Sequence, residues 1–380
     1  DHVMHLPDQE ITIAERLKEL GYATGHFGKW HLSRLRHSQP QPSDQGFDYS
    51  FGTDNNASPN HWSPNNFVRN GKPVGETKGY SCKLVVNEAL DWLRDVKSSN
   101  PQQPTFSCIW FHEPHTPIAS PAAWIRRYER MFPTIGKKQA TYYANISNVD
   151  DAVGRLMNQL KELGMEKETF VFLTSDNGPL NAYSKVGLRG KKSHVWEGGH
   201  RVPGIFRWPG RIEAGSVSSE PICGVDFFPT VCELVGTDLP DGRPIYGTSV
   251  LPILMNKSPN FQRQNPLYWF FYRLNPAIAM REGPWVIIAE TNDASRPKAH
   301  SLLREDIEFI KSSRPESFEL YRLTQDLAQR VDLADQEPEV LSRMRQKLNG
   351  FHADVVSEGV AWDIPAEYGE GRKKQLWKSR

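Results

Sequence analysis

The sequence lacks any long apolar run. No stretch of about 18 apolar residues occurs along its 380 residues, so no membrane-spanning helix is expected. An excess of one charge is also absent, because 46 Lys and Arg are balanced by 45 Asp and Glu for a formal net charge of +1. Any preference for anions must therefore come from a local cluster of cations. The basic segment 372–380 is interpreted as a solvated tail, and neither a membrane nor a nucleic acid is expected as a partner.

Cysteine is scarce, with four residues in the chain. No Cys-x-x-Cys spacing is present to suggest a metal or redox motif. Cys108 lies in an apolar segment, which predicts a buried and free thiol. Cys223 and Cys232 leave two alternatives open, a disulfide between them or a helix that runs from one to the other. Cysteine therefore does not define the compartment of this protein.

The most informative segment runs from Leu173 to Pro209. An apolar, strand-like stretch ends here in Thr-Ser-Asp-Asn-Gly, which places Asp176 and Asn177 at the end of a strand. Open α/β sheets bind their ligands at this edge. Adjacent Asp and Asn supply hard oxygen ligands of the kind that Ca²⁺ or Mg²⁺ prefers. The alternative is an ordinary turn, because Asp-Asn and Asn-Gly pairs tolerate the left-handed conformation.

Cations follow closely on this segment and create a local positive field. A hard cation together with such a cluster suits an anionic tetrahedral ester, which makes a phosphoryl or sulfuryl group the expected reacting centre. A pair of adjacent lysines on a solvated surface is the alternative interpretation. The cluster comprises Lys191, Lys192, His194, His200 and Arg201.

A second cluster, Gly28-Lys29-Trp30-His31, follows a helix and a short strand. Thr12 and Glu15 form a plausible capping box at the start of the predicted helix, and Gly21 is a suitable terminator. Residues 22–27 then form the predicted strand. Lys29 and His31 are expected at its far end, although a charged strand tip without function would have the same pattern.

A third segment, Phe106–Phe111, is apolar and strand-like, and it precedes His112 and His115. Prolines in this segment exclude a regular helix, so a zinc site with helical ligand spacing is a weak interpretation. A histidine on the loop after a buried strand is better placed to meet a substrate anion. If the three strands are parallel, all three loops converge at one edge of the sheet.

The remaining pattern predicts an α/β protein with two domains. Helices are expected over 81–96, 142–163 and 225–234, and the catalytic domain is expected to span 1–256. Several short strands followed by one helix at 338–355 predict a C-terminal α+β subdomain over 257–380, a small antiparallel sheet packed by a helix. The segment Ser33 to Gly79 is interpreted as a long loop beside the substrate cleft. Within it, His61 and Trp62 either contact a sugar ring or, in the case of the tryptophan, pack under the loop itself.

Four segments, in the same order, resemble the type I sulfatase family of the alkaline phosphatase superfamily. The resemblance covers almost the whole chain, and it implies a large mixed sheet flanked by helices with a smaller C-terminal antiparallel sheet and helix. The segments are ITIAERLKELGYATGHFGKWHLS, VDDAVGRLMNQLKELGMEKETFVFLTSDNG, LRGKKSHVWEGGHRVPGIFRWPG and SFELYRLTQDLAQRVDLA.

The resemblance implies a role for each matching residue. Lys29 matches the lysine that holds the sulfate, and His31 matches the histidine that contacts the catalytic hydroxyl. His115 matches the histidine that contacts sulfate or the leaving oxygen, and Lys192 the lysine beside the bridging oxygen. Asp176 and Asn177 match two ligands of a divalent cation, usually Ca²⁺ and possibly Mg²⁺ in this chain. The turn Glu197, Gly198, Gly199 and Arg201 is interpreted as mainly structural.

The sequence departs from the family pattern at the nucleophile. None of Cys82, Cys108, Cys223 and Cys232 begins a Cys-x-Pro-x-Arg segment, and no serine does. The Asp-Asp pair that completes the metal site in the family has no counterpart either. Both features are expected upstream of Asp1, where a formylglycine-generating enzyme would modify the nucleophile. The chain as given is therefore expected to be inactive.

Three functions are compatible with these patterns. The favoured one is a sulfatase acting on a sulfated small molecule or glycan, and the resemblance implies a periplasmic, extracellular or lysosomal setting. A phosphate or phosphonate ester hydrolase of the same superfamily would use identical charges. A pseudo-sulfatase that binds sulfated glycans without turnover is the third, and an upstream segment without the nucleophile would favour it.

Overall fold

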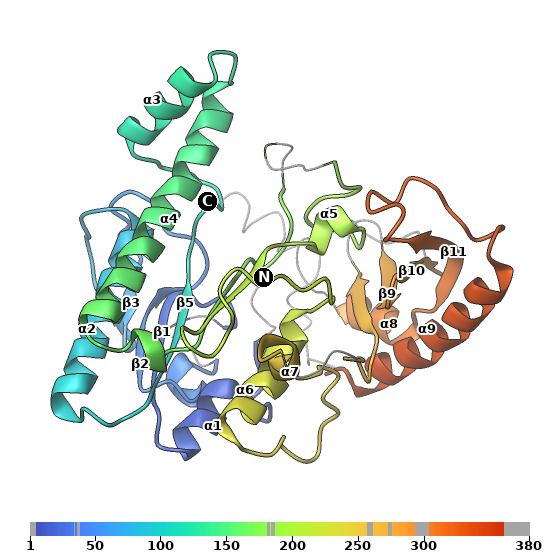
Figure 1. Cartoon of the computed structure of the whole chain (residues 1–380), viewed down its shortest axis with the longest axis horizontal. Coiled ribbons are helices and arrows are strands. Elements are labelled where there is room, and N and C mark those ends of the chain that lie inside the picture. The colour runs from blue at the N-terminus through green and yellow to red at the C-terminus, as the bar shows by residue number, and fades with distance from the viewer. Residues whose placement is uncertain are drawn as a thin grey trace. The chain divides into compact units, whose positions relative to one another are not determined.

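The computed structural model describes residues 5–33, 35, 39–180, 183, 187–256, 261–272, 276–292 and 304–360. The chain divides into two compact units, which are described one at a time (Figure 1). The N-terminal unit is His2–Thr169, and the C-terminal unit is Phe170–Arg380 together with Asp1. The tail at 372–380 lies outside the described residues.

The N-terminal unit contains a mixed five-stranded sheet in the order β4-β3-β2-β1-β5. The central strand β1 runs parallel to both β2 and β5, whereas β3 and β4 add antiparallel pairs at one edge. The strands are β1 Ala23–Lys29, β2 Tyr49–Thr53, β3 Val68–Arg69, β4 Lys72–Pro73 and β5 Thr105–Trp110. The short 3-10 helix η1 (Pro42–Gln45) precedes β2.

Helices lie on both faces of this sheet, and β1 is therefore buried along almost its whole length. On one face, Phe27 packs against Trp92 of α2 (Ser81–Ser99). On the other face, Ala14 of α1 (Ile13–Glu19) shares a core cluster with Trp30 and neighbouring apolar side chains. Helix α4 (Lys137–Glu162) packs on α2, and α3 (Ala122–Met131) packs on α4 (Figure 1). The 3-10 helix η2 (Glu166–Glu168) follows α4.

The C-terminal unit begins with a two-stranded antiparallel sheet of β6 (Val171–Thr174) and β7 (Gly204–Arg207). Its larger sheet is antiparallel, with the order β11-β10-β9-β8. The strands are β8 Leu267–Phe271, β9 Ala277–Glu282, β10 Trp285–Thr291 and β11 Pro315–Arg322, and the helices are α5 Glu197–His200, η4 Gly224–Asp226, α6 Phe227–Val235, α7 Leu251–Leu254, α8 Arg304–Ser312 and α9 Pro338–Glu358.

Alternation along β10 explains how this sheet is buried on both faces. Ile287 belongs to a core cluster that includes Met344 and Leu348 of α9, whereas Val286 and Ile288 belong to a second cluster with Val195. Successive side chains of a strand point to opposite faces, so one strand contributes to both clusters. Complete burial of Met344 and Leu348 stabilises the docking of α9 by about 1.5–3 kcal/mol each.

Most fold predictions are confirmed. The structure contains the mixed sheet flanked by helices and the smaller antiparallel sheet with its helix, and Thr12 and Glu15 form the predicted capping box. Cys223 and Cys232 are both free, with η4 and α6 between them. The segment Ser33 to Gly79 is not a plain loop, because it contains β2, β3 and β4. The domain boundary at 256/257 stays a prediction.

Candidate anion-binding site

The end of β1 carries Lys29 and His31, the first two predicted site residues. Lys29 is the last residue of β1 and pairs with Thr53 of β2. The next two amides continue this contact, because Trp30 N donates to Thr53 O at 2.9 Å and His31 N donates to Asp54 O at 3.0 Å. His31 has a φ of 53°, a left-handed conformation that costs a non-glycine residue energy and persists only where neighbouring bonds enforce it.

Gly28 brings the ends of three strands close together. Its φ is +108°, and a Cβ atom at this position would lie 1.9 Å from the carbonyl oxygen of Trp110 in β5. A Cβ atom on Gly52 in β2 would lie 2.2 Å from the carbonyl oxygen of Gly28. Only glycine permits both close approaches. The glycine of the Gly-Lys-Trp-His segment therefore sets the spacing at the sheet edge that carries Lys29.

The loop after β5 separates its two histidines. His112 is buried, and its Nε2 lies 2.8 Å from Thr53 Oγ1 at the end of β2. Burial, with help from the nearby charge of Lys29, lowers the pKa of His112 to about 3, so this ring is neutral near pH 7. His115 is half-buried, and its Nδ1 contacts the carbonyl oxygen of Thr116 at 2.7 Å. His115 is therefore the histidine of this loop that solvent and ligands can reach.

A buried polar network anchors the loop from behind. The carboxylate of Glu113 accepts hydrogen bonds from the Ser81 hydroxyl and, at 3.0 Å, from the Cys82 amide in the first turn of α2. Asn145 of α4 donates from Nδ2 to Ala119 O at 3.0 Å, and the same nitrogen lies 3.1 Å from Nδ1 of His61. These contacts join α2, α4 and the loop, so they fix the backbone on which His115 sits.

This network was missed in the sequence, and it corrects one expectation. His61 is only 1% exposed, so the prediction that its ring contacts a sugar is wrong. Burial lowers the pKa of His61, which keeps the ring neutral inside the network. Trp62 is 48% exposed and packs on Tyr80 with a ring separation of 4.7 Å. A histidine in an Asn- and Pro-rich segment gives no signal that it will be buried.

In the C-terminal unit, the loop after β6 carries Asp176 and Asn177. Asp176 is exposed and Asn177 is half-buried. The following glycine is packed tightly, because Gly178 N donates to Gly199 O at 2.9 Å and a Cβ atom on Gly178 would lie 2.2 Å from Gly198 O. Lys192 N donates to Pro179 O at 2.9 Å. Main-chain bonds thus join the segments that carry Asp176, Asn177 and Lys192.

Glu197 anchors this second loop region. Its buried carboxylate accepts from Arg201 at 2.8 Å, lies 3.4 Å from His200, and its amide donates to Gln329 Oε1 at 2.7 Å. Burial alone would raise the pKa of Glu197, but the hydrogen bonds from His200 and Arg201 outweigh it and lower this pKa. A buried, paired carboxylate is therefore a structural element of the turn.

Asp176 and Asn177 fit part of a site for a hard cation. The exposed carboxylate and the amide oxygen have the chemistry that Ca²⁺ prefers, and Ca²⁺ takes about 6–8 oxygen ligands. Within the residues that the structure describes, no group of three or more His, Cys, Asp or Glu side chains is placed to hold a metal ion. These two residues therefore supply only some of the ligands that such an ion needs.

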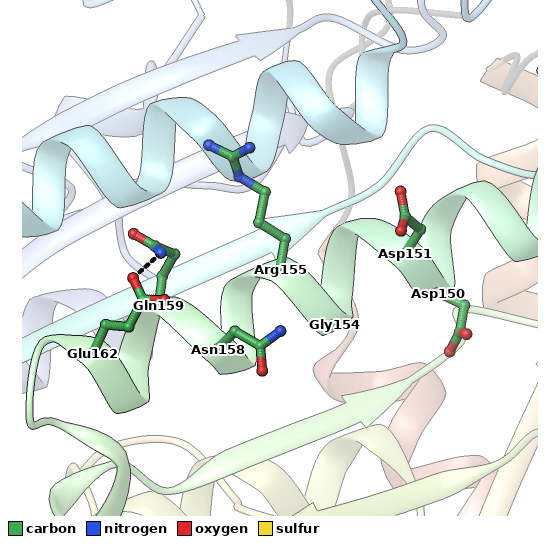
Figure 2. Close-up of a pocket in the computed structure, with 7 residues that line it drawn as sticks. All are labelled: Asp150, Asp151, Gly154, Arg155, Asn158, Gln159 and Glu162. Atoms are coloured by element: carbon green, nitrogen blue, oxygen red, sulfur yellow. Dashed lines mark hydrogen bonds between the residues drawn. The ribbon is translucent and has the colours of Figure 1, made fainter.

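A polar hollow elsewhere in the N-terminal unit is not a candidate site. Figure 2 shows that the residues lining it all come from α4. Some of its polar groups already have partners, since Asp151 pairs with Lys83 at 2.7 Å and Gln159 donates to Glu162. None of the predicted site residues lines it. The lining residues are Asp150, Asp151, Gly154, Arg155, Asn158, Gln159 and Glu162.

Each unit thus gathers one half of the predicted residues. Adjacent parallel strands bring Lys29, His31 and His115 to one edge of the five-stranded sheet. Asp176, Asn177 and Lys192 lie on hydrogen-bonded segments next to β6, which pairs with β7 in a separate sheet. The expectation that all three strands are parallel neighbours in one sheet is therefore wrong for β6.

Comparison with known proteins identifies the family. The family model described as Sulfatase matches residues 3–237. The chain belongs to the sulfatase family. A second family model, described as N-sulphoglucosamine sulphohydrolase, C-terminal, matches residues 189–354 of this chain.

No helix among the described residues is long and apolar enough to span a membrane.

Curated relatives of this chain include enzymes of several names. An arylsulfatase of Hemicentrotus pulcherrimus is 31% identical over 308 residues, which cover 74% of this chain and 52% of the relative. An N-acetylgalactosamine-6-sulfatase of Canis lupus familiaris is 31% identical over 302 residues, with 74% and 54% covered. The chain thus spans about half the length of these relatives.

Solved structures share the fold. A structure described as Ps i-CgsB in complex with k-i-k-neocarrahexaose has a TM-score of 0.78 at 22% identity, and the match covers 100% of this chain and 80% of that one. A second structure holds its substrate, D-glucosamine-2-N,6-O-disulfate, and has a TM-score of 0.66 at 19% identity, with 93% and 84% covered. At these identities the similarity establishes the fold alone.

Proposed function

We propose that the protein containing this chain is a sulfuric ester hydrolase that cleaves sulfate monoesters of a carbohydrate or an aryl compound. Membership of the sulfatase family supports the reaction class. The observation that carries the proposal is the sheet edge in the N-terminal unit, where Lys29, His31 and His115 follow adjacent parallel strands. Its cation and reachable histidine suit an anionic ester rather than a neutral one.

The proposed roles follow from the charges that develop when a sulfate ester is cleaved. Negative charge grows on the sulfuryl oxygens and on the departing oxygen, so ammonium groups fixed beside them lower the barrier. Lys29 and Lys192 take this part. His31 accepts a proton from the attacking hydroxyl, and His115 or Lys192 delivers one to the leaving oxygen.

Two groups that this chain does not supply belong to the proposal. Asp176 and Asn177 would hold a Ca²⁺ or Mg²⁺ ion together with further ligands that the described residues do not provide, and the ion would add positive charge beside the sulfuryl oxygens. The nucleophile would be the hydroxyl of a hydrated formylglycine. None of the four cysteines begins the Cys-x-Pro-x-Arg segment that would be modified. If the protein carries such a segment elsewhere, a formylglycine-generating enzyme would be its partner.

A carbohydrate substrate is favoured by the relatives and neighbours. One relative is named an N-acetylgalactosamine-6-sulfatase, and one neighbouring structure holds D-glucosamine-2-N,6-O-disulfate as its substrate. Both names refer to a sulfated amino sugar. Aryl sulfates remain useful as probes, because the family includes arylsulfatases.

The test is release of inorganic sulfate by the full-length protein. We expect the protein to hydrolyse 4-nitrophenyl sulfate faster than 4-nitrophenyl phosphate, with sulfate measured by ion chromatography. Substitution His115→Gln should lower this rate strongly, whereas the melting temperature should change little because His115 is only half-buried. Faster release of phosphate would identify a phosphate ester hydrolase instead. Binding of sulfated sugars without turnover would identify a pseudo-sulfatase.

A further inference from the structure

The hairpin of α3 and α4 carries an uncompensated group of cations. Residues 122–140 contain five basic side chains and a single acidic one, Glu129, and all five basic side chains are exposed. Three of them lie on α3, and two lie in the first turn of α4. We call this set the basic hairpin surface: Arg126, Arg127, Arg130, Lys137 and Lys138.

The fold turns the α3 arginines toward solvent. Trp124, Ile125 and Tyr128 are half-buried and recur at helical spacing. Tyr128 Oη lies 2.7 Å from Ser147 Oγ of α4, and its ring lies 5.5 Å from the ring of Tyr143. Because this apolar stripe faces α4, the exposed arginines occupy the rest of the α3 surface.

These cations have no acidic partner among the residues that the structure describes. Other surface cations of the same unit do, such as Lys83 with Asp151 and Arg94 with Asp91. Within the basic hairpin surface, the contact found is a cation–π one, with the Arg127 guanidinium 5.1 Å from the Trp124 ring centroid.

Clustering these charges weakens the hairpin. Arg126 and Arg130 are four residues apart on one helix, and like charges at this spacing destabilise a helix by about 0.2–0.5 kcal/mol. Lys137 and Lys138 lie in the first turn of α4, where the helix dipole favours anions instead. Stability therefore does not explain the cluster, whereas binding of an anionic partner would.

The basic hairpin surface is joined to the loop of His115. The loop reaches the start of α3 by Pro121, and six residues of extended chain span at most ~20 Å. The connection is anchored on α4, because Asn145 Nδ2 donates to Ala119 O at 3.0 Å and Ser120 Oγ donates to Thr141 O at 2.8 Å. The start of α3 therefore lies within about 20 Å of His115, a distance that a bound polymer can span.

We propose that the basic hairpin surface binds the sulfate groups of a sulfated polysaccharide next to the one being cleaved. This inference rests on the proposed function, because it places the reacting sulfate at His115. A regular array of sulfates matches a group of fixed cations without acidic partners, and the contacts are of a kind that salt weakens. The protein would then prefer polymers over small esters through binding rather than chemistry.

The test compares two triple variants with the same net charge. Arg126→Gln/Arg127→Gln/Arg130→Gln removes the arginines of the basic hairpin surface. The control Lys161→Gln/Arg211→Gln/Arg330→Gln removes three exposed cations elsewhere, and Arg211 matches Arg127 because its guanidinium lies 5.5 Å from the Trp208 ring. Dextran sulfate is the probe, with unsulfated dextran beside it, and titration calorimetry at two salt concentrations measures the affinity.

We expect the hairpin variant to bind dextran sulfate about tenfold more weakly, equivalent to about 1.4 kcal/mol, and with a flatter salt dependence. The control variant should bind dextran sulfate as the parent does, and none of the three proteins should bind unsulfated dextran. Equal loss in both variants would overturn the proposal, because binding would then depend on net charge alone. Equally tight binding of duplex DNA or of phosphatidylserine vesicles would overturn the assignment to sulfated glycans.

Failure of this proposal can be told apart from failure of the proposed function. In the full-length enzyme, the hairpin variant should hydrolyse 4-nitrophenyl sulfate at the parental kcat and KM, while the KM for a sulfated polysaccharide rises. An enzyme that hydrolyses both substrates identically in parent and variant would overturn the hairpin proposal alone. The parent protein could instead bind the polymer without releasing sulfate, while the variant fails to bind it. That result would support the hairpin proposal and contradict the proposed hydrolase function.

Discussion

The loops after β1 and β5 carry Lys29, His31 and His115, whereas the loop after β6 carries Asp176 and Asn177, and the two regions are built differently. Lys29 and His31 extend from a strand buried on both faces, and their backbone is bonded to the neighbouring strand β2. Asp176 and Asn177 follow a strand with one partner, in a sheet where Leu173 is 36% and Ile205 is 56% exposed. Burial and main-chain hydrogen bonds together hold the segment of Lys29 and His31, whereas the loop after β6 has main-chain hydrogen bonds beside a more exposed strand.

The difference suggests a division of labour between the two regions. A rigid sheet edge suits residues that must keep a fixed position relative to a reacting sulfuryl group. An exposed carboxylate beside glycine-rich segments suits residues that take up a cation and adjust to it.

Lys192→Ala should lower turnover of the full-length enzyme by on the order of 10²-fold or more, because one fixed donor to the developing charge is lost. Lys191→Ala is the matched control, since Lys191 is the adjacent and more exposed cation. Steady-state kinetics on an aryl sulfate measures both. Activity of Lys192→Ala within a few-fold of the parent would remove Lys192 from the site, as would an equal loss in the control.

Gly28→Ala should destabilise the N-terminal unit by about 2–3 kcal/mol, because the residue has a positive φ and the new Cβ would meet the carbonyl oxygen of Trp110. Chemical denaturation followed by tryptophan fluorescence measures the loss, because Trp30 and Trp92 are buried in this unit. Parental stability in this variant would show that the sheet edge is less tightly packed than described.

Acid should weaken the N-terminal unit as the pH falls from about 6.5 toward about 3. Burial lowers the pKa values of His26 and His112 to about 3, so the folded state stays neutral at these rings while the unfolded state takes up protons below its own pKa. Each histidine contributes up to about 1.4 kcal/mol per pH unit in this window. Their full contribution to stability is therefore present above pH 6.5.

Near β6, the pH response is expected to come from Glu197 and to begin at a lower pH. The lowered pKa of Glu197 contributes stability that is lost only as the pH falls below about 4.5. Hydrogen exchange of each region, corrected for intrinsic rates and compared between pH 7 and 5, should show β1 and β5 losing protection before β6. The same loss in all three strands, or a His112→Gln variant with unchanged pH dependence, would contradict this order.

Gly154→Ala should have the smallest effect, a gain of roughly 0.5–1 kcal/mol, because alanine is the better helix former. Gly154 is exposed within α4, and a Cβ atom there would meet nothing within 4 Å. This variant is also the control for Gly28→Ala, since both changes add one methyl group. Thermal unfolding measures the difference, and a loss of stability would point to an unseen partner on this face of α4.

Sequence patterns predicted the regular elements well where a local signal existed. The capping box at Thr12, the apolar strand before His112 and the long amphipathic helix before Gly164 all have physical causes within a few residues of chain. The strands within Ser33 to Gly79 were missed, because β2 is stabilised by its place beside β1 rather than by its own composition. Tertiary context overrides weak local preference at such positions.

The candidate site was predictable in residue type but not in exposure. His112 and His115 lie three residues apart in similar sequence, yet one is buried against Thr53 and the other is not. The anchoring pair Glu113 and Asn145 comes from elements far apart in the chain, so only the fold reveals their network. Charge patterns thus identified the groups that meet a ligand, while the groups that position them required the structure.

We propose that Lys29 and Lys192 both act on the sulfuryl group that is cleaved. A double-mutant cycle on sulfate release by the full-length enzyme tests it most directly, with Lys29→Ala, Lys192→Ala and the double variant. If both lysines contact one group, the double variant should lose less activity than the product of the single losses, with a coupling energy above ~0.5 kcal/mol. Losses that multiply independently would contradict the claim and assign the two lysines to separate sites.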